Sequence, residues 1–382
     1  MNGSPLRVCY FGTYRSEYSR NRILIEGLRR NGVLVIECHE RLWGGIEDRV
    51  ETVQGGWKRP RFWWRVATVY ARLIRRYWQL GGAYDVLVVG YPGQLDVFLA
   101  RLLSWLHRKP LVWDIFMSVY LIATERGLDK KSGLAVALLR RLEWLACRLP
   151  DRLIIDTSDY AAWFAETHNV PPERFHLVPT GADDRLFYPI PPSPQKADER
   201  FTVLYYGTFI PNHGVQTIVE AAALLADDPT IHFELIGDGP ERLAAAALSQ
   251  EKMLTNVTFV EWLVGDALRQ RIADADLCLG VFGATPQSLM TVQNKIYECL
   301  AMGKPVLTGA GPAVAQALTH RLHLYLCERQ NPAALAQAIR ALRDDPDLRQ
   351  QLSRQGRMFF CQEFRPESLG ARMATILEQT DR

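Results

Sequence analysis

Short apolar runs alternate with helical patterns along the first half of the chain. The run 7–11 ends at Gly12, residues 21–30 have the apolar spacing of a helix, and a second run follows at 33–37. A strand, a helix and a strand in close succession are typical of a parallel sheet. Three further runs continue this series: 85–89, 111–113 and 152–155. The pattern predicts a doubly wound α/β domain.

The same pattern restarts after a proline-rich segment. Residues 187–201 read FYPIPPSPQKADERF, the composition of a stiff connector. Five strand-like runs follow, separated by helical patterns: 202–206, 232–236, 257–260, 277–279 and 305–307. The last helical patterns have no strand after them. The domains we expect are a first domain 1–186, a linker 187–200, a second domain 201–360, and a helix 361–382 that packs toward the first domain.

This order predicts two doubly wound Rossmann-like domains that face one cleft with the carboxyl ends of their strands. The composition is that of a globular protein, with 48% hydrophobic and 23% charged residues in 382. No apolar run is long enough for a membrane helix, and the N-terminus lacks the features of a secretory signal. The seven cysteines are scattered and never spaced C-x-x-C. We therefore expect a cytoplasmic protein.

Two glycine-containing turns follow predicted strands of the second half. Gly207 and Gly214 bound the loop after 202–206, and Gly237 begins the turn after 232–236. Glycines permit positive φ and the close approach of backbone N–H groups to an anion. A purely structural turn is the alternative interpretation, and the dinucleotide fingerprint G-x-G-x-x-G is missing.

Lys295 and Glu298 lie one turn apart on the predicted helix 293–302. Lys295 is in the first turn, where its ammonium and the free N–H groups point the same way. A cation at a helix N-terminus suits a diphosphate, and a carboxylate one turn deeper suits the two hydroxyls of a ribose. A surface Lys–Glu pair is the alternative.

Several motifs together resemble a known family. The segment Val178-Pro-Thr-Gly-Ala-Asp183, followed by Phe187 and Pro189, resembles the P-N-G-x-D…F-x-P signature of family-four (group 1) retaining glycosyltransferases with the GT-B fold. Four more segments resemble the family's motifs in the same order: 207–214, 237–240, 256–259 and 298–306. The first domain resembles the family only in its architecture and in Gly12.

The resemblance implies a nucleotide-sugar site in the second domain. Glu298 matches the glutamate that binds the ribose, and the loop at Gly207 with the helix start at Thr291-Val292 would hold the diphosphate. The nucleotide-binding set that we expect is Gly12, Gly207, Thr208, His213, Gly237, Thr291, Val292, Lys295 and Glu298.

Four positions depart from the family pattern. Met290 stands where the family has its first motif glutamate, which contacts the donor sugar. Thr208 and His213 replace an arginine and a lysine, and Phe116 replaces a histidine. Inactivity, or altered binding of the donor, is therefore an open alternative.

Departure of the leaving group places negative charge on the diphosphate, which a cation stabilises. We expect Lys295 to supply this charge at pH 7, with protonated His213 as the second candidate. The sequence offers no protein nucleophile, so the resemblance implies front-face attack with retention. It implies no metal and no cofactor beyond the nucleoside diphosphate-sugar co-substrate. His320, His323 and Cys327 form a weak alternative metal set.

Polar residues of the first domain are candidates for acceptor binding. Arg15 and Arg20 follow the first strand and would meet an acidic acceptor or the donor phosphates; solvent-facing arginines are the alternative. Asp114, which ends a strand, is a candidate catalytic base or acceptor-orienting group. It would be the base if the reaction inverted, and a helix cap is the alternative.

The charge is unevenly distributed, since residues 1–190 hold 27 basic and 20 acidic side chains although the whole chain has a net charge of only +3. A predicted helix within 61–79 places arginines on the face opposite its aromatic residues, which suits an anionic membrane surface. Peripheral attachment to the inner face of the cell membrane is the hypothesis that follows. The membrane-contact candidates are Trp57, Arg61, Trp64, Arg65, Arg72 and Arg76. An outer helix with its apolar stripe in the core is the other interpretation, and we expect the two together: the stripe mostly inward, with the arginines and some tryptophans outward. Nucleic acid is disfavoured, because the pI of 8.4 is modest and no reader module is recognisable.

The leading hypothesis is a hexosyl- or related glycosyltransferase that moves a sugar from a nucleoside diphosphate-sugar to a hydroxyl of a lipid-linked or polysaccharide acceptor. A nucleotide-sugar epimerase or hydrolase on the same fold is one alternative. A degenerate, non-catalytic nucleotide-sugar-binding protein is the other, raised by Met290 and Thr208.

Overall fold

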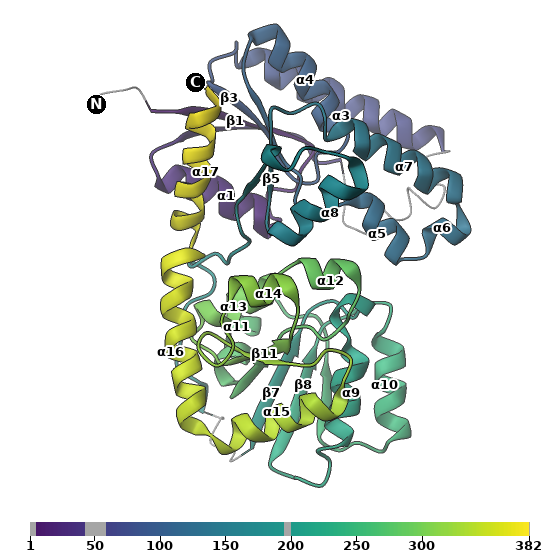
Figure 1. Cartoon of the computed structure of the whole chain (residues 1–382), viewed down its shortest axis with the longest axis vertical. Coiled ribbons are helices and arrows are strands. Elements are labelled where there is room, and N and C mark those ends of the chain that lie inside the picture. The colour runs from purple at the N-terminus through teal and green to yellow at the C-terminus, as the bar shows by residue number, and fades with distance from the viewer. Residues whose placement is uncertain (1–4, 43–58, 195–199, 382) are drawn as a thin grey trace. The chain divides into compact units, whose positions relative to one another are not determined.

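The computed structural model describes residues 5–42, 59–194 and 200–381, and the chain forms two compact units (Figure 1). Unit 1 comprises Met1–Pro179 with Pro366–Arg382, and unit 2 comprises Thr180–Arg365. Each unit contains one six-stranded sheet in which all neighbouring strands are parallel. These are the two Rossmann-like domains that the apolar runs predicted.

The sheet of unit 1 has the order β2-β1-β3-β4-β5-β6. Its strands are β1 (Arg7–Gly12), β2 (Leu34–His39), β3 (Val86–Val89), β4 (Leu111–Asp114), β5 (Arg152–Ile155) and β6 (Phe175–Leu177). Its helices are α1 (Ser19–Arg30), α3 (Pro60–Gln79), α4 (Asp96–His107), α5 (Val119–Glu125), α6 (Leu128–Lys131), α7 (Gly133–Ala146), α8 (Ser158–His168), the short η2 (Pro172–Arg174) and α17 (Pro366–Asp381).

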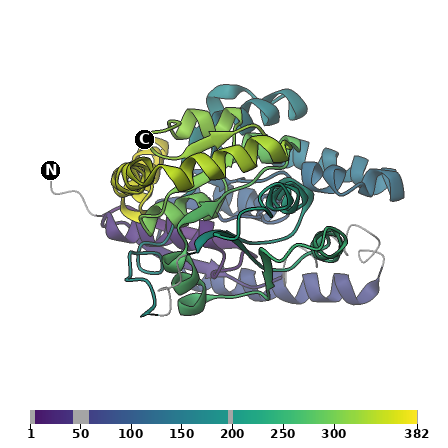
Figure 2. The same ribbon diagram turned by 90° about the horizontal axis from the view of Figure 1, so that it is seen from below.

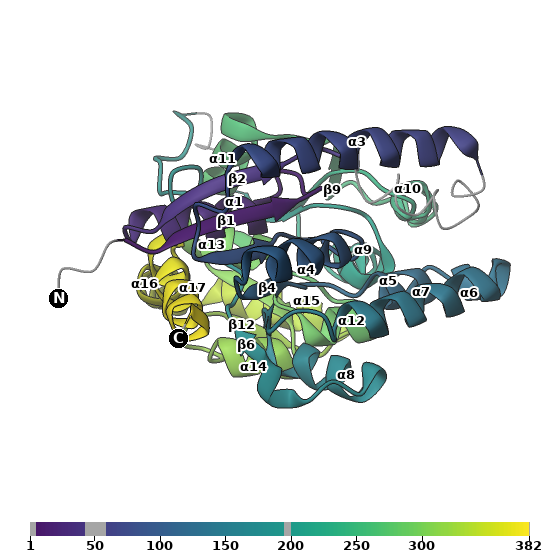
Figure 3. The same cartoon turned by 90° about the horizontal axis from the view of Figure 1, so that it is seen from above.

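Helices cover both faces of this sheet. Val8, Tyr10 and Val88 point into a core that α1 and α17 close. The alternate residue Phe11 points to the other face, where its ring lies 5.9 Å from that of Tyr77 on α3. Figure 3 shows α3 and α4 over this second face. Two-sided burial explains why these strands are continuous apolar runs.

The sheet of unit 2 has the order β12-β11-β10-β7-β8-β9. Its strands are β7 (Phe201–Tyr206), β8 (Ile231–Ile236), β9 (Val257–Val260), β10 (Leu277–Leu279), β11 (Val306–Gly309) and β12 (Tyr325–Cys327). Its helical segments are η4 (Pro211–His213), α9 (Val215–Ala223), α10 (Arg242–Glu251), α11 (Gly265–Asp274), α12 (Pro286–Met290), α13 (Asn294–Ala301), α14 (Pro312–Ala317), α15 (Pro332–Asp344) and α16 (Pro346–Glu363).

Two separate cores lie on the faces of this second sheet. One core joins the strands to α9 and α15, which contact each other (Figure 2). The other joins them to α11, α13, α14 and α16. The first turn of α13 lies near the carboxyl end of β7, because the hydroxyl of Tyr206, which ends that strand, contacts the carbonyl oxygen of Lys295. Open parallel sheets bind ligands at this edge.

The unit boundaries differ from those expected. The chain divides after Pro179 and after Arg365, and the described part of the proline-rich segment belongs to unit 2. Phe187 and Ile190 pack against the second core, and Ser193 donates two hydrogen bonds to Asp274. These contacts attach the segment to unit 2, although its composition alone indicates a connector.

The terminal helix α17 belongs to unit 1, where it packs on α1. The two helices cross at Gly27 and Gly370. Their backbones approach so closely there that a Cβ on Gly27 would lie 2.1 Å from the carbonyl oxygen of Pro366. Two strands, β6 and β12, were not among those predicted; both are edge strands and are less buried than the predicted three-residue strand β10.

Candidate functional site

The loops after β7 and β8 meet at the carboxyl edge of the second sheet. Gly207 has φ +137° and Gly237 has φ +136°, conformations that favour glycine. A Cβ on Gly237 would lie 2.0 Å from the carbonyl oxygen of Gly207. The two turns therefore approach so closely that only glycine fits, and they bring backbone groups together where β7 and β8 end.

Lys295 lies beside this glycine turn. Its side chain is buried, and its Nζ has no hydrogen-bond partner among the described residues. A Cβ on Gly207 would lie 2.8 Å from Nζ, so the backbone of residue 207 borders the ammonium. The N-cap residue of α13, Gln293, makes no side-chain capping bond. An unpaired cation and an uncapped helix N-terminus together suit an anion.

Burial lowers the pKa of Lys295 from 10.5 to about 7, while Cys299 and Glu298 act in the opposite direction. The expectation that Lys295 is fully charged at pH 7 is therefore wrong for the protein without ligand. A bound diphosphate would restore the charge, because a nearby anion favours the protonated form.

Glu298 lies on the same helix, one turn on. The hydroxyl of Tyr206 donates a 2.7 Å hydrogen bond to Oε2 of Glu298 and lies 3.3 Å from the carbonyl oxygen of Lys295. Tyr206 ends β7, so the end of the strand orients the carboxylate. The structure thus brings Gly207, Lys295 and Glu298 together, and Lys295 is buried rather than at the surface.

His213 does not supply a second cation. Its Nδ1 lies 2.5 Å from the carbonyl oxygen of Thr208 and 2.9 Å from the hydroxyl of Tyr205. Burial and the charge of Lys295 hold the pKa of His213 well below its usual range. The carbonyl only accepts, so the neutral ring donates through Nδ1 and keeps a lone pair on Nε2. Protonated His213 as a catalytic cation is therefore a wrong prediction.

The segment between α12 and α13 offers backbone rather than side chains. Thr291 donates its hydroxyl to the carbonyl oxygen of Gln287, and Val292 packs in the core. Met290 is 9% exposed and apolar, so the departure from the family pattern leaves no carboxylate there. Only the main chain of Thr291 and Val292 is left to face a ligand.

Unit 1 places its candidate residues differently from the expectation. Arg20 and Asp114 are both fully buried, and Nη2 and Nε of Arg20 donate to both oxygens of Asp114 at 2.8 to 3.2 Å. Nη1 of Arg20 donates to the carbonyl oxygens of Val178 and Pro179. The expected roles of Arg20 in acceptor binding and of Asp114 as base or cap give way to a buried ion pair that joins α1 to β4.

Gly12 and Arg15 are also already engaged. Gly12 has φ +135°, and a Cβ there would lie 2.7 Å from Oδ2 of Asp96. The carboxylate of Asp96 accepts hydrogen bonds from the N–H and the hydroxyl of Thr13, and an acidic group in this position disfavours a diphosphate at Gly12. Arg15 pairs with Glu17 at 3.1 Å in a partly exposed position. Phe116, in place of the family's histidine, has φ 50° and stacks under the guanidinium of Arg20 at 5.0 Å.

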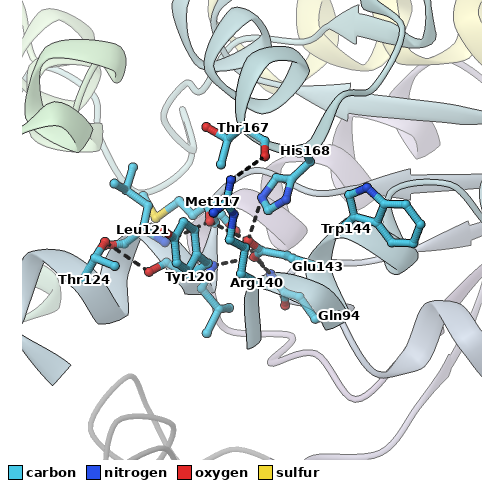
Figure 4. A network of polar contacts seen from close by, with 12 residues as sticks. Gln94, Met117, Tyr120, Leu121, Thr124, Arg140, Glu143, Trp144, Thr167 and His168 are labelled. Atoms are coloured by element: carbon cyan, nitrogen blue, oxygen red, sulfur yellow. Dashed lines mark hydrogen bonds and ion pairs between the residues drawn. The ribbon is translucent and has the colours of Figure 1, made fainter. Parts of the chain in front are cut away.

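A buried carboxylate in α7 fixes the loop after β4 (Figure 4). Glu143 accepts hydrogen bonds from the hydroxyl of Ser118 and the N–H of Val119, both at 2.6 Å. His168 lies 3.3 Å from the same carboxylate. The network positions the loop from which Phe116 projects, and its members come from three separate helices and a loop.

Sequence analysis missed Asp156, which follows β5. Its side chain is 4% exposed, and neither carboxylate oxygen has a hydrogen-bond partner among the described residues. Burial raises the pKa of Asp156 to about 7, and the charge of Arg20 opposes this shift. An apolar strand before a lone aspartate at the sheet edge is the signal that could have found it.

The basic aromatic helix forms as predicted and becomes α3. Arg61, Trp64, Arg65, Arg72 and Arg76 are exposed, whereas Trp57 lies outside the described residues. Arg72 and Arg76 both pair with Glu40. Phe62, Val69, Leu73 and Tyr77 are buried, so the apolar stripe packs inward and the arginines face outward, as expected.

Neither a metal site nor a membrane helix emerges from the described residues. No group of three metal-ligating side chains is found there. Nδ1 of His323 accepts the N–H of Thr319, and Nδ1 of His320 accepts that of Leu326. Backbone contacts therefore explain both histidines of the weak metal set. None of the described helices combines the length and low polarity that a bilayer crossing requires.

Comparison with known proteins assigns the chain to a class. Two Rossmann-like domains, one of which gathers an unpaired lysine, a glycine turn and a glutamate at its sheet edge, define a GT-B glycosyltransferase. A profile described as "Glycosyl transferases group 1" matches residues 200–345, and one described as "Glycosyl transferase 4-like domain" matches residues 13–181. The chain belongs to the group 1 glycosyltransferases.

Individual relatives agree with this assignment. The lipopolysaccharide core biosynthesis glycosyltransferase LpsD of Rhizobium meliloti (strain 1021) is 29% identical over 42% of this chain and 45% of LpsD. The match therefore spans less than half the length of LpsD. A D-inositol 3-phosphate glycosyltransferase of Thermobispora bispora is 24% identical over 67% of this chain and 68% of the relative. The crystal structure of Anabaena HepE with UDP shares the fold, with a TM-score of 0.70 and 15% identity over 98% of this chain and 100% of HepE.

Proposed function

We propose that this enzyme transfers a hexosyl or related sugar from a nucleoside diphosphate-sugar to a hydroxyl of a lipid-linked or polysaccharide acceptor. The observation that carries the proposal is the unpaired ammonium of Lys295, which lies beside the backbone of Gly207 in the first turn of α13. The diphosphate occupies this place, and Glu298 accepts hydrogen bonds from the ribose hydroxyls.

A uridine nucleotide is the first donor to test. The HepE structures that share the fold contain UDP or UDP-glucose. In this chain the site for such a donor lies within unit 2, where Lys295 and Glu298 are on one face of α13.

The lysine stabilises the charge that develops when the bond between the anomeric carbon and the diphosphate oxygen breaks. The acceptor hydroxyl oxygen bonds to the same face of that carbon, and its proton passes to the departing phosphate oxygen. This route retains the anomeric configuration and uses neither a protein nucleophile nor a metal. With Asp114 buried against Arg20, the structure offers no reason to prefer an inverting base.

The function of one relative, LpsD, favours a glycan or lipid-linked acceptor. LpsD acts in lipopolysaccharide core biosynthesis. The helices α3, α4 and α7 of unit 1 expose large apolar side chains. They are Trp63, Trp64 and Trp78 of α3, Leu102, Trp105 and Leu106 of α4, and Leu134, Leu138, Trp144 and Leu145 of α7. With the exposed arginines of α3, these side chains suit peripheral attachment to an anionic membrane.

The test of transfer uses the full chain with UDP-glucose, UDP-glucuronate or UDP-N-acetylglucosamine and a panel of glycan and lipid-linked acceptors. We expect UDP release that depends on an acceptor and a product that retains the anomeric configuration. Full turnover with donor alone would favour the epimerase or hydrolase. Binding of UDP without any acceptor-dependent release would favour the degenerate binding protein.

The test of membrane attachment is sedimentation with vesicles at low salt. We expect the protein to sediment with phosphatidylglycerol vesicles and not with phosphatidylcholine vesicles. The double substitution Trp63→Ala and Trp64→Ala should release at least half of the bound protein. Leu243→Ala, which changes a still more exposed apolar side chain of unit 2, is the control and should change nothing. Equal sedimentation with both lipids would contradict an electrostatic membrane surface.

A further inference from the structure

Arg329 follows the last strand of the second sheet, two residues after β12 ends, and lies across the end of β11. A Cβ on Gly309 would lie 2.5 Å from Cγ of Arg329, and one on Gly311 would lie 3.4 Å from its Nε. The arginine fits against position 309 because that residue is glycine, and it passes position 311 at ordinary contact distance. Its guanidinium is thus carried to the carboxyl edge of the sheet, the edge that bears Lys295.

The guanidinium is held by neutral groups alone. Nε donates to the carbonyl oxygen of Ala310 at 2.6 Å, and Nη1 donates to the carbonyl oxygen of Gly283 at 2.5 Å and to the hydroxyl of Ser288 at 2.8 Å. Nη2 makes no hydrogen bond to a described residue, and no described acidic side chain forms an ion pair with Arg329. The orientation of the guanidinium group is therefore fixed, and Nη2 remains available as a hydrogen-bond donor.

Arg329 is a partly buried cation without a carboxylate. The two arginines that are buried among the described residues, Arg20 and Arg101, each pair with one, Asp114 and Asp151. Burial lowers the pKa of Arg329 to about 10, so it keeps its charge at neutral pH. An arginine desolvated in this way interacts strongly with any anion that approaches it.

The contacts of Arg329 lead directly to the loop that follows β7. The hydroxyl of Ser288, which accepts from Nη1, donates at 2.8 Å to the carbonyl oxygen of Asn212. The next residue, His213, accepts the N–H of Phe282 on its carbonyl oxygen at 2.9 Å. Arg329 is thereby connected through α12 to the loop that begins at Gly207.

We propose that Arg329 binds an anionic group of the nucleotide-sugar donor through its free Nη2. The group is either a carboxylate on the transferred sugar or a non-bridging oxygen of the diphosphate. The inference rests on the proposed function, because it assumes that the donor occupies this edge of unit 2. It supplies a cation that the loop after β7 lacks, since His213 there is neutral.

The test measures the dissociation constants of UDP, UDP-glucose and UDP-glucuronate by calorimetry for the full chain and for Arg329→Gln. If the sugar carboxylate is the ligand, the substitution raises the dissociation constant of UDP-glucuronate at least tenfold and changes those of UDP and UDP-glucose less than twofold. If the diphosphate is the ligand, it weakens all three at least fivefold. Unchanged affinity for all three in Arg329→Gln would overturn the inference and leave the proposed function standing.

Two controls separate binding from support of the loops. Ser288→Ala removes one partner of Nη1 and keeps the cation, so we expect less than a threefold effect on any of the three constants. A loss in Ser288→Ala equal to that in Arg329→Gln would overturn the inference, because Arg329 would then act only by holding the loops. Arg321→Gln changes an exposed arginine of the same unit and should have no effect.

If Arg329→Gln does not fold, Arg329→Lys serves in its place. It keeps the charge and loses the Nη2 donor, and we expect a three- to tenfold loss for the same ligands. Unchanged constants in a folded Arg329→Lys would overturn the inference. Failure of the unchanged protein to bind all three ligands would instead overturn the proposed function, and the inference with it.

Discussion

The ammonium of Lys295 lies 4.1 Å from the centre of the Tyr205 ring and has no hydrogen-bond partner among the described residues. The ring face attracts the cation, but by only about 1–2 kcal/mol, which does not compensate for full burial. The pKa of Lys295 therefore falls to about 7. A group that is half protonated near neutral pH and borders a glycine turn is well suited to gain its proton when an anion binds.

We expect UDP binding to take up a proton. Above pH 7 the ligand-free protein has mostly neutral Lys295, and the diphosphate favours the ammonium, so the affinity should fall by up to about tenfold for each further pH unit. Calorimetry at pH 8 in buffers of different ionisation enthalpy should show an uptake between about 0.5 and 1 proton per UDP. Lys295→Met should abolish it and weaken UDP more than UMP. Equal uptake in Lys295→Met would remove Lys295 from the phosphate site.

Glu298→Ala should weaken UDP at least tenfold, because about 1.5–3 kcal/mol of charged hydrogen bonding to the ribose is lost. Tyr206→Phe, which removes only the hydroxyl that orients this carboxylate, is the matched control and should cost less. The measurement is again the dissociation constant. An affinity for UDP that Glu298→Ala leaves unchanged would mean that Glu298 does not contact the ribose.

Gly27→Ala should destabilise unit 1 by about 1–3 kcal/mol or more, because the new methyl group would collide with the backbone of α17 at Pro366 and Gly370. The melting temperature measures the effect. Gly133→Ala is the control, since a Cβ there meets no atom within 4 Å. If both variants melted with the wild type, the close crossing of α1 and α17 would be wrong.

Asp156→Asn should change how stability depends on pH. The folded protein holds a proton on Asp156 up to about pH 7, whereas the unfolded chain releases it near 3.8, so folding loses stability as the pH rises between these values. The variant should match the wild type near pH 4 and exceed it by about 4 kcal/mol above pH 7. Denaturant unfolding at several pH values tests this. If the free energies of unfolding of the two proteins changed with pH in the same way, the pKa of Asp156 would not be raised by burial.

The sequence predicted the parts of the structure that local pattern determines. The apolar runs became the central strands of both sheets because parallel strands are buried on both faces. Lys295 and Glu298 lie on one face of α13, as the spacing of a helix requires. The glycines at 207 and 237 have positive φ, as their place after strands suggested.

What the sequence could not predict depends on contacts between distant segments. Arg20 and Asp114 are 94 residues apart, and nothing local indicates that they form a buried pair. The neutral state of His213 follows from its burial beside Lys295, and the position of Arg329 follows from three strands that end together. Each of these required the folded sheet.

The most direct test is a crystal structure of the protein grown with UDP. We predict the diphosphate beside Lys295 Nζ and the backbone of Gly207, with the ribose hydroxyls within hydrogen-bond distance of Glu298. Density for UDP at any other place, with these three residues unoccupied, would contradict a nucleotide site at the carboxyl edge of unit 2.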